Sequence, residues 1–211
     1  MKISKKLASY LLQSKAIIID PANPFTWASG WQSPIYCDNR KTLSYPQIRQ
    51  FIRDSFEQQI RVHFNKPDMI AGVATGAIAH AVLVSEKMGL PFIYVRSSQK
   101  SHGTGKLIEG DPSRGRSVVI IEDLVSTGGS SLKAAGDLRN AGLEVTGMLA
   151  IFTYGFPVAV ENFRNAGVPL ISLCNYDTLI EEALRTGYIS QDVLETLSQW
   201  RDDPGQWKPE S

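Results

Sequence analysis

A short hydrophobic run followed at once by two acidic residues most constrains the fold of this chain. Residues 118–121 (VVII) are all β-branched, and Glu122 and Asp123 come directly after them. A short apolar run of this kind, flanked by charge and glycine, is typical of a buried strand in a parallel sheet. Parallel sheets carry helices on their faces. The run therefore predicts an α/β chain with two carboxylates at the carboxyl end of a central strand.

The turn after this strand is rich in glycine and hydroxyl groups. Residues 126–131 are Ser-Thr-Gly-Gly-Ser-Ser, and residues 132–140 have helical composition. Backbone N–H groups, hydroxyls and the positive end of a helix can together bind a phosphate, and the two acids can accept hydrogen bonds from sugar hydroxyls. An ordinary βα turn with a Ser/Thr N-cap is the alternative. The segment matches neither the Walker A loop nor the G-x-G-x-x-G pattern.

The remaining chain alternates between expected strands and helices, which predicts a central parallel sheet flanked by helices. Residues 1–45 do not fit the alternation. We expect them to form a small N-terminal hood over the carboxyl edge of the sheet, where ligands of open α/β sheets bind. Part of the C-terminal region would pack on this hood, and residues 46–211 would form the core. Helices are expected over residues 5–14, 45–64, 78–88 and 132–140, with residues 162–166 closing another, and over 176–200 with one interruption at Gly187-Tyr188. Strands are expected over 16–19, in the middle of 33–38, and over 68–73, 91–95, 118–121, 145–152 and 170–173.

Composition narrows the class of protein. The chain has 22 basic and 21 acidic residues, so its overall charge does not favour nucleic acid and any phosphate site must be local. No apolar stretch approaches the roughly 20 residues of a membrane helix, and the N-terminus lacks the pattern of a signal peptide. Cys37 and Cys174 lie far apart without metal-ligand spacing, which indicates reduced thiols in a cytoplasmic protein.

The strand, the Glu-Asp pair and the glycine-hydroxyl turn together resemble the phosphoribosyl-diphosphate (PRPP) loop of type I phosphoribosyltransferases. The resemblance implies the fold of that family, a central parallel sheet flanked by helices with a small N-terminal hood. It also implies that the two acids hold the ribose hydroxyls and that the turn holds the 5-phosphate. The PRPP-binding residues that it implies here are Glu122, Asp123, Leu124, Val125, Ser126, Thr127, Gly128, Gly129 and Ser130.

A second turn after an expected strand, residues 71–77, consists of small residues. Small side chains let a phosphate approach backbone amides. Taken alone, the pattern is explained as well by packing of a helix on a strand. Beside the PRPP loop, the resemblance implies a diphosphate-binding loop. Some family members carry a lysine in this turn and this chain has none.

Residues 99–116 form a long polar segment without periodicity, and such connections are usually functional or disordered. With Arg96 before it, the segment resembles the mobile catalytic loop of orotate phosphoribosyltransferases. The resemblance implies that Arg96, Lys100 and His102 are catalytic and bind PRPP, neutralising the leaving diphosphate and excluding water. It also implies a homodimer in which the loop reaches into the neighbouring site. From composition alone, a solvated polar loop is the alternative.

Residues 25–40 indicate the branch of the family. They contain F-T-x-x-S-G-x-x-S-P-x-Y, which resembles the hood of orotate phosphoribosyltransferases. The resemblance implies that Ser29, Gly30 and Ser126 bind orotate. Some relatives add an arginine for the orotate carboxylate after the strand over 145–152. In this chain that region, residues 151–155, reads Ile-Phe-Thr-Tyr-Gly without an arginine, so the partner of the carboxylate stays open.

Asp38 and Arg40 follow the hood motif. We expect them to form a local ion pair that holds the hood rather than to contact a ligand.

The resemblance implies a reaction of orotate with PRPP to give orotidine 5'-phosphate and diphosphate, with Mg2+ carried by the diphosphate and no metal ligand from the protein. No nucleic acid or membrane is expected as a partner. One alternative is a phosphoribosyltransferase for another base, such as a purine, which predicts a different hood. Another is a regulatory protein of this fold that binds nucleotides and RNA, which would need a basic face.

Overall fold

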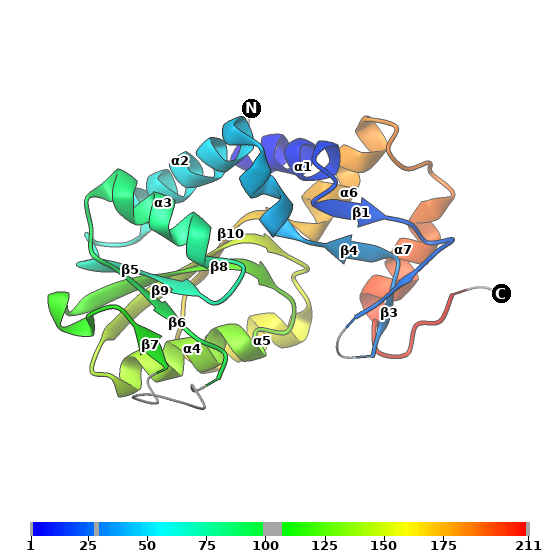
Figure 1. The fold of residues 1–211 in the computed structure, drawn as a ribbon. Helices are drawn as coiled ribbons and strands as arrows, with labels where there is room; N and C mark the ends of the chain where they lie inside the picture. The colour runs from blue at the N-terminus through cyan, green and yellow to red at the C-terminus, as the bar shows by residue number, and fades with distance from the viewer. Residues whose placement is uncertain (1, 28–29, 99–106, 210–211) are drawn as a thin grey trace.

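The computed structural model describes residues 2–27, 30–98 and 107–209. They form a six-stranded sheet flanked by helices, with two small antiparallel strand pairs beside it (Figure 1). The first five strands in the order below are parallel, and β7 runs antiparallel to β6. The predicted α/β fold with a central parallel sheet is confirmed. The order across the sheet is β10 (Leu170–Asn175), β9 (Glu144–Thr153), β8 (Ser117–Val125), β5 (Met69–Val73), β6 (Phe92–Val95) and β7 (Ile108–Glu109).

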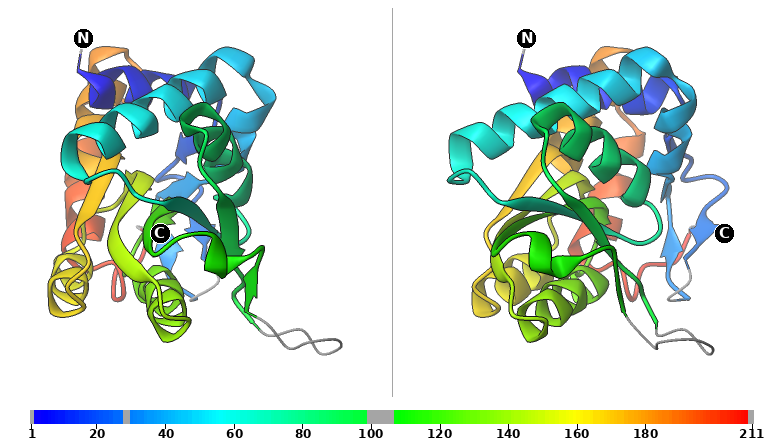
Figure 2. Two further views of the ribbon diagram at one scale, coloured as in Figure 1. Left: turned by 90° about the vertical axis from the view of Figure 1, so that its left-hand side faces the viewer. Right: turned by 60° about the vertical axis from the view of Figure 1, so that its left-hand side comes forward.

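A hydrophobic cluster covers each face of the sheet. Each central strand contributes to both clusters, because its successive side chains point to opposite faces. In β8, Val119 and Ile121 belong to one hydrophobic cluster, and Val118 and Ile120 to the other. Figure 2 shows helices on the two opposite sides of the sheet. The first cluster includes residues of α1 (Ile3–Gln13), α2 (Pro46–His63), α3 (Ile78–Met88), α6 (Tyr176–Arg185) and α7 (Val193–Asp202), and the second includes residues of α4 (Gly129–Asn140) and α5 (Pro157–Asn165).

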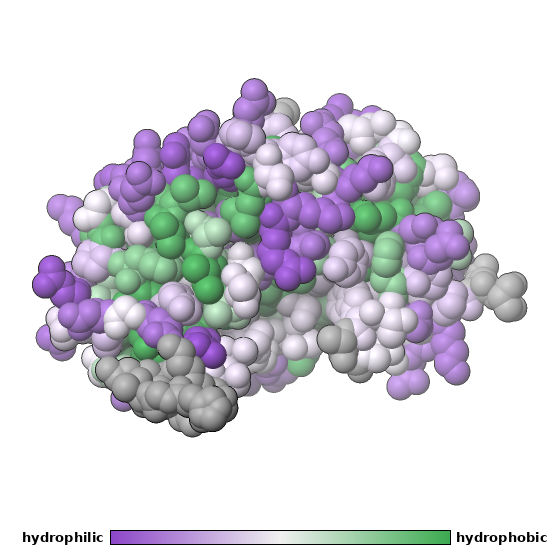
Figure 3. Space-filling model, viewed as in Figure 1, coloured by the Kyte–Doolittle hydropathy of each residue, from purple (hydrophilic) through white to green (hydrophobic). Residues whose placement is uncertain are grey.

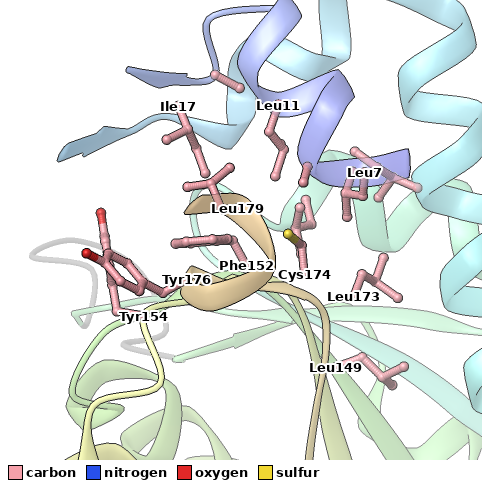
Figure 4. Packing of buried hydrophobic residues seen from close by; sticks show 14 of the residues in the cluster. Leu7, Leu11, Ile17, Leu149, Phe152, Tyr154, Leu173, Cys174, Tyr176 and Leu179 are labelled. Atoms are coloured by element: carbon pink, nitrogen blue, oxygen red, sulfur yellow. The ribbon is translucent and has the colours of Figure 1, made fainter. Parts of the chain in front are cut away.

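The first cluster extends from the sheet to the N-terminal segment. Leu7 and Leu11 of α1 lie beside Leu173 and Cys174 of β10 (Figure 4). The same cluster reaches Tyr154 just beyond β9. The hydrophobic core thus connects the N-terminal segment to the carboxyl edge of the sheet.

The N-terminal segment contains two short strand pairs. β1 (Ile17–Ile19) pairs antiparallel with β4 (Ile35–Cys37), and β2 (Phe25–Thr26) with β3 (Gln32–Ser33). The 3-10 turn η1 (Asn39–Ser44) then leads into α2, which has Pro46 in its first turn. None of the helices in the described ranges is long and apolar enough to cross a membrane.

Several element boundaries differ from the predictions. The strand predicted over residues 118–121 continues to Val125, because its pairing with β9 continues to Thr153. The helix predicted from Leu132 begins at Gly129. The polar segment before β8 contains β7, whose two residues pair with β6 and form the edge of the sheet.

Two predicted interruptions are confirmed. The helical region expected over residues 176–200 is interrupted at Gly187-Tyr188, between α6 and α7, and Gly187 has a φ of +69°, a left-handed conformation suited to glycine. The strand-like middle of residues 33–38 forms β4, and Pro34, which lacks the N–H needed for strand pairing, separates it from β3.

Candidate active site

Glu122 and Asp123 lie in the second half of β8, and only one of them is deeply buried. Glu122 is 3% exposed. Its Oε2 accepts a hydrogen bond from Ser131 Oγ at 2.8 Å, and its Oε1 accepts one from the Asp123 N–H at 3.0 Å. Burial, with a smaller contribution from the Asp123 charge, raises the pKa of Glu122 well above its usual range. Glu122 therefore ties the strand to the start of α4, while Asp123 is the more exposed carboxylate.

Three segments meet at Asp123. The side-chain Nδ2 of Asn39 donates to the main-chain oxygen of Asp123 at 2.6 Å. Gly76, in the small-residue turn after β5, lies so close that a Cβ there would overlap the Asp123 carboxylate. The same turn contains a cis peptide bond between Ala74 and Thr75. The η1 turn, the turn after β5 and the end of β8 thus enclose one carboxylate.

A cavity of about 330 Å³ opens beside these acids, between the carboxyl ends of β5, β6 and β8 and the first turns of α4. We name this hollow the PRPP cavity after the sequence prediction. Of the residues predicted to bind PRPP, it brings together Arg96, Glu122, Asp123, Leu124, Ser126 and Ser130. Its other lining residues are Val73, Ala74, Val95, Ser97, Lys133, Ala134 and Asp137.

The predicted phosphate turn has a fixed backbone between β8 and α4. Gly128 has a φ of +85°, and a Cβ there would lie 2.7 Å from the ring of Phe163, so both conformation and space favour glycine. The main-chain oxygen of Thr127 accepts a hydrogen bond from Asn162 Nδ2 at 3.1 Å. Gly129 is the first residue of α4, and Val125 is buried in the core.

Arg96 follows β6 directly and lines the PRPP cavity. Its Nη1 lies 3.5 Å from Glu109 Oε1, and its Nε donates to the Ser98 main-chain oxygen at 3.4 Å. The other two residues predicted for the catalytic loop, Lys100 and His102, lie outside the described residues.

Lys133 and Asp137 line the cavity, although the sequence analysis did not select them. They form an ion pair with Lys133 Nζ 2.9 Å from Asp137 Oδ2. Helical spacing could have identified them, because residues three and four apart share one face of a helix. From Ser130, this spacing leads to Lys133, Ala134 and Asp137. That face of α4 borders the cavity.

A second cavity, of about 420 Å³, adjoins the first and is bordered mainly by aromatic rings. Leu124 and Ser126 line both cavities, so the two hollows meet at the end of β8. The rings of Trp27 and Tyr154 have centroids 5.0 Å apart. Besides the two shared residues, this base cavity is lined by Thr26, Trp27, Tyr36, Cys37 and Tyr154.

One of the two predicted hood contacts, Gly30, is hydrogen-bonded to Trp27, which lines this second cavity. Gly30 has a φ of +86° in the turn between β2 and β3, and its N–H donates to the Trp27 main-chain oxygen at 2.9 Å. Ser29 lies outside the described residues. The predicted ion pair is confirmed, with Arg40 Nε 2.7 Å from Asp38 Oδ1. This hydrogen bond lowers the pKa of Asp38.

Comparison with known proteins identifies the family. Residues 41–157 match the phosphoribosyl transferase domain. The chain is 57% identical to the orotate phosphoribosyltransferase of Porphyromonas gingivalis, over 97% of this chain and 98% of that protein. It resembles the solved structure of Leishmania donovani UMP synthase at 30% identity and a TM-score of 0.78, over 93% of this chain and 42% of that longer chain. It resembles Aeropyrum pernix orotate phosphoribosyltransferase at 26% identity and a TM-score of 0.73, over 87% of this chain and 99% of that one. From its aromatic hood to its PRPP loop, the chain belongs to the orotate phosphoribosyltransferases within the phosphoribosyltransferase family.

Proposed function

We propose that the two adjoining cavities bind PRPP and orotate, and that the protein transfers the phosphoribosyl group to orotate, giving orotidine 5'-phosphate and diphosphate. The observation that carries the proposal is the junction of the cavities at Leu124 and Ser126. One cavity presents carboxylates, hydroxyls and an arginine, and the other presents flat aromatic walls. A sugar in the first and a planar base in the second would meet where the new bond forms, and this positioning would supply much of the catalysis.

The PRPP cavity offers a partner for each part of a phosphorylated sugar. Asp123, held by Asn39 and enclosed by Gly76, can accept hydrogen bonds from the ribose hydroxyls. The turn from Ser126 to Ser130 and the N-terminus of α4 can hold the 5-phosphate with N–H groups and hydroxyls. In this proposal Glu122 supports the site indirectly, because it accepts the hydrogen bond from Ser131 in the first turn of α4.

The departing diphosphate requires positive charge. Loss of diphosphate builds negative charge on the leaving group and positive character on the ribose carbon. Arg96 borders the cavity and can bind phosphate oxygens with its planar fork. We propose that Lys100 and His102 add further donors to the same group.

Mg2+ would accompany the diphosphate. This ion prefers oxygen ligands and keeps several waters, so it commonly binds through substrate phosphates and one or two carboxylates. Within the described ranges, no group of three or more His, Cys, Asp and Glu side chains could hold a metal, and Asp123 supplies a carboxylate beside the proposed diphosphate site. Bound Mg2+ would neutralise charge on the diphosphate.

We also propose a cytoplasmic homodimer that shares its catalytic loops. Hydrophobic side chains gather over α3 and β6 (Figure 3), where Val82 is 42% exposed and the Phe92 and Tyr94 rings stack at 6.3 Å. An exposed apolar area of this kind often marks an interface. The free thiols of Cys37 and Cys174 support a reducing compartment.

The test is the consumption of orotate after addition of PRPP and Mg2+, with uracil, adenine and hypoxanthine in parallel. We expect orotate alone to react. Asp123→Asn provides a control with a nearly unchanged side-chain shape, and it should lower turnover at a given PRPP concentration. Consumption of a purine would leave the PRPP cavity assigned and refute the orotate assignment. Binding of PRPP without turnover of any base would favour the regulatory alternative.

A further inference from the structure

We propose that Tyr154 binds the pyrimidine substrate directly, with its hydroxyl donating a hydrogen bond to the carboxylate of the base. The inference rests on the proposed function, because it assigns a contact in the base cavity. It also addresses an open question in this chain, since the described residues that line that cavity include no lysine or arginine.

The hydroxyl of Tyr154 lacks a partner within the described part of the chain. Tyr154 is only 1% exposed and lines the base cavity. Its neighbour Tyr176 shows the usual arrangement, since its hydroxyl donates to the Leu197 main-chain oxygen at 2.9 Å. Figure 4 shows both rings at the edge of the hydrophobic core. This hydroxyl is not one of the fully buried unpaired polar atoms of the described chain. With Tyr154 on the cavity wall, the hydroxyl can therefore donate to a molecule in the cavity.

The Tyr154 ring is held firmly in place. Its centroid lies 5.0 Å from that of Trp27, 5.2 Å from Phe152, 5.5 Å from Phe156 and 5.6 Å from Trp200. A ring enclosed in this way has little freedom to lose when a ligand binds, and such preorganisation favours affinity.

The backbone also positions Tyr154 relative to the predicted base contact. The N–H of Tyr154 donates to the Val125 main-chain oxygen at 3.2 Å, and Ser126 is the next residue along that neighbouring strand end. The cavity therefore has a tyrosine hydroxyl and a serine hydroxyl on two adjacent segments. Both can donate to an anionic group of the base.

Tyr154 suits a carboxylate better than the other hydroxyls of the cavity do. Burial raises the pKa of Tyr154 well above its usual range, so the hydroxyl stays a donor at neutral pH. Tyr36 is 37% exposed and has access to water. Thr26 is exposed as well, and its hydroxyl is held by a hydrogen bond that it accepts from Gln32 Nε2 at 2.9 Å.

The experiment compares Tyr154→Phe with Tyr176→Phe. Each variant loses one buried hydroxyl and keeps its ring, but only the first loses the proposed substrate contact. For Tyr154→Phe we expect the KM for orotate to rise at least about tenfold, as for a hydrogen bond to a charged group, with the KM for PRPP within about twofold of the parent. For Tyr176→Phe we expect the orotate KM to stay unchanged.

Inhibition by uracil distinguishes the carboxylate from the ring, because uracil lacks the carboxylate. We expect Tyr154→Phe to leave the uracil inhibition constant unchanged while weakening orotate. An unchanged orotate KM, or equal weakening of orotate and uracil, would overturn the proposal. If the parent enzyme did not consume orotate at all, the proposed function would fail instead, and the two failures are thus distinguishable.

Discussion

Gly76 shows how a single missing side chain can determine the position of a functional group. A Cβ at this position would overlap the Asp123 carboxylate, which can move because it is the end of a side chain. We therefore expect Gly76→Ala to fold normally but to displace Asp123 and raise the KM for PRPP about tenfold or more. Steady-state kinetics and a thermal unfolding curve measure the two effects.

Gly136→Ala is the matched control for this substitution. Apart from its chain neighbours and the adjacent backbone of α4, no described atom lies within 4 Å of a Cβ built at Gly136. Alanine there should leave the KM for PRPP unchanged and stabilise the helix by about 0.5–1 kcal/mol. A Gly76→Ala enzyme with the parent KM would show that Asp123 does not bind the sugar.

His80 makes the stability of the protein depend on pH. It is 1% exposed, its Nε2 lies 3.3 Å from Thr42 Oγ1, and burial lowers its pKa to about 4. Between pH 6.5 and about 4, the unfolded chain therefore binds a proton that the native protein does not. This site stabilises the fold fully above pH 6.5, and its contribution should fall by about 2 kcal/mol between pH 7.5 and 5.0.

Urea unfolding at these two pH values tests the assignment. His80→Gln should lose less stability than the parent on acidification, whereas His63→Gln, at an exposed position on α2, should behave like the parent. Equal pH dependence in the parent and His80→Gln would refute a neutral buried His80.

Among single residues, those of the candidate site were easier to identify from the sequence when they lay in one contiguous motif. One contiguous motif, at the end of β8 and the start of α4, contains Glu122, Asp123, Ser126 and Ser130. The structure brings these residues to one cavity. Tyr154 was noted only as a departure from the family pattern, because its importance depends on contacts with distant rings. Periodicity cannot reveal such contacts.

Among the elements, α7 contacts the hood and the base cavity although it lies far from both in the sequence. Its Trp200 is fully buried, and its ring lies 5.8 Å from that of Trp27 and 5.6 Å from that of Tyr154. Its Nε1 also donates to the Gln32 main-chain oxygen at 3.2 Å. The helix thus supports two walls of the base cavity from behind.

Trp200→Ala should therefore destabilise the protein and loosen the hood. We expect a loss of about 3–5 kcal/mol in the free energy of unfolding, as for other buried tryptophans, and faster hydrogen exchange in residues 25–37. Val160→Ala, at a position 64% exposed on α5, should change neither. Unchanged exchange in residues 25–37 of Trp200→Ala would show that α7 does not support the hood.

The central elements could be predicted because their signals are local. The β-branched run of β8 and the apolar spacing of α2 and α3 identified these elements from nearby residues alone. The end of β8 and the existence of β7 depend on pairing with β9 and β6, which sequence periodicity does not report.

For the whole molecule, we propose a hood of residues 1–45 on a core of residues 46–211. The strand pairs β1–β4 and β2–β3 lie beside the base cavity. The first of these pairs shares the hydrophobic cluster of α1 and the central strands through Ile17 and Ile35, whereas β2 and β3 contribute no buried residue to it among the described residues. We therefore expect the β2–β3 pair to move more easily than α1 when orotate binds.

Mixing two inactive variants tests the proposed sharing of catalytic loops between the chains of a homodimer. Lys100→Ala would damage the loop and Asp123→Asn the PRPP cavity. In a hybrid dimer, one site would combine an intact loop from one chain with an intact cavity from the other, and the second site would carry both defects. Random exchange makes half of the dimers hybrid, so the mixture should recover about a quarter of the parent activity.

If each loop instead serves its own chain, every site contains one defect and mixing restores nothing. Sedimentation of the mixture, with labelled Asp123→Asn chains, would verify that exchange took place, so that a mixture of confirmed hybrids without activity would refute the shared loop.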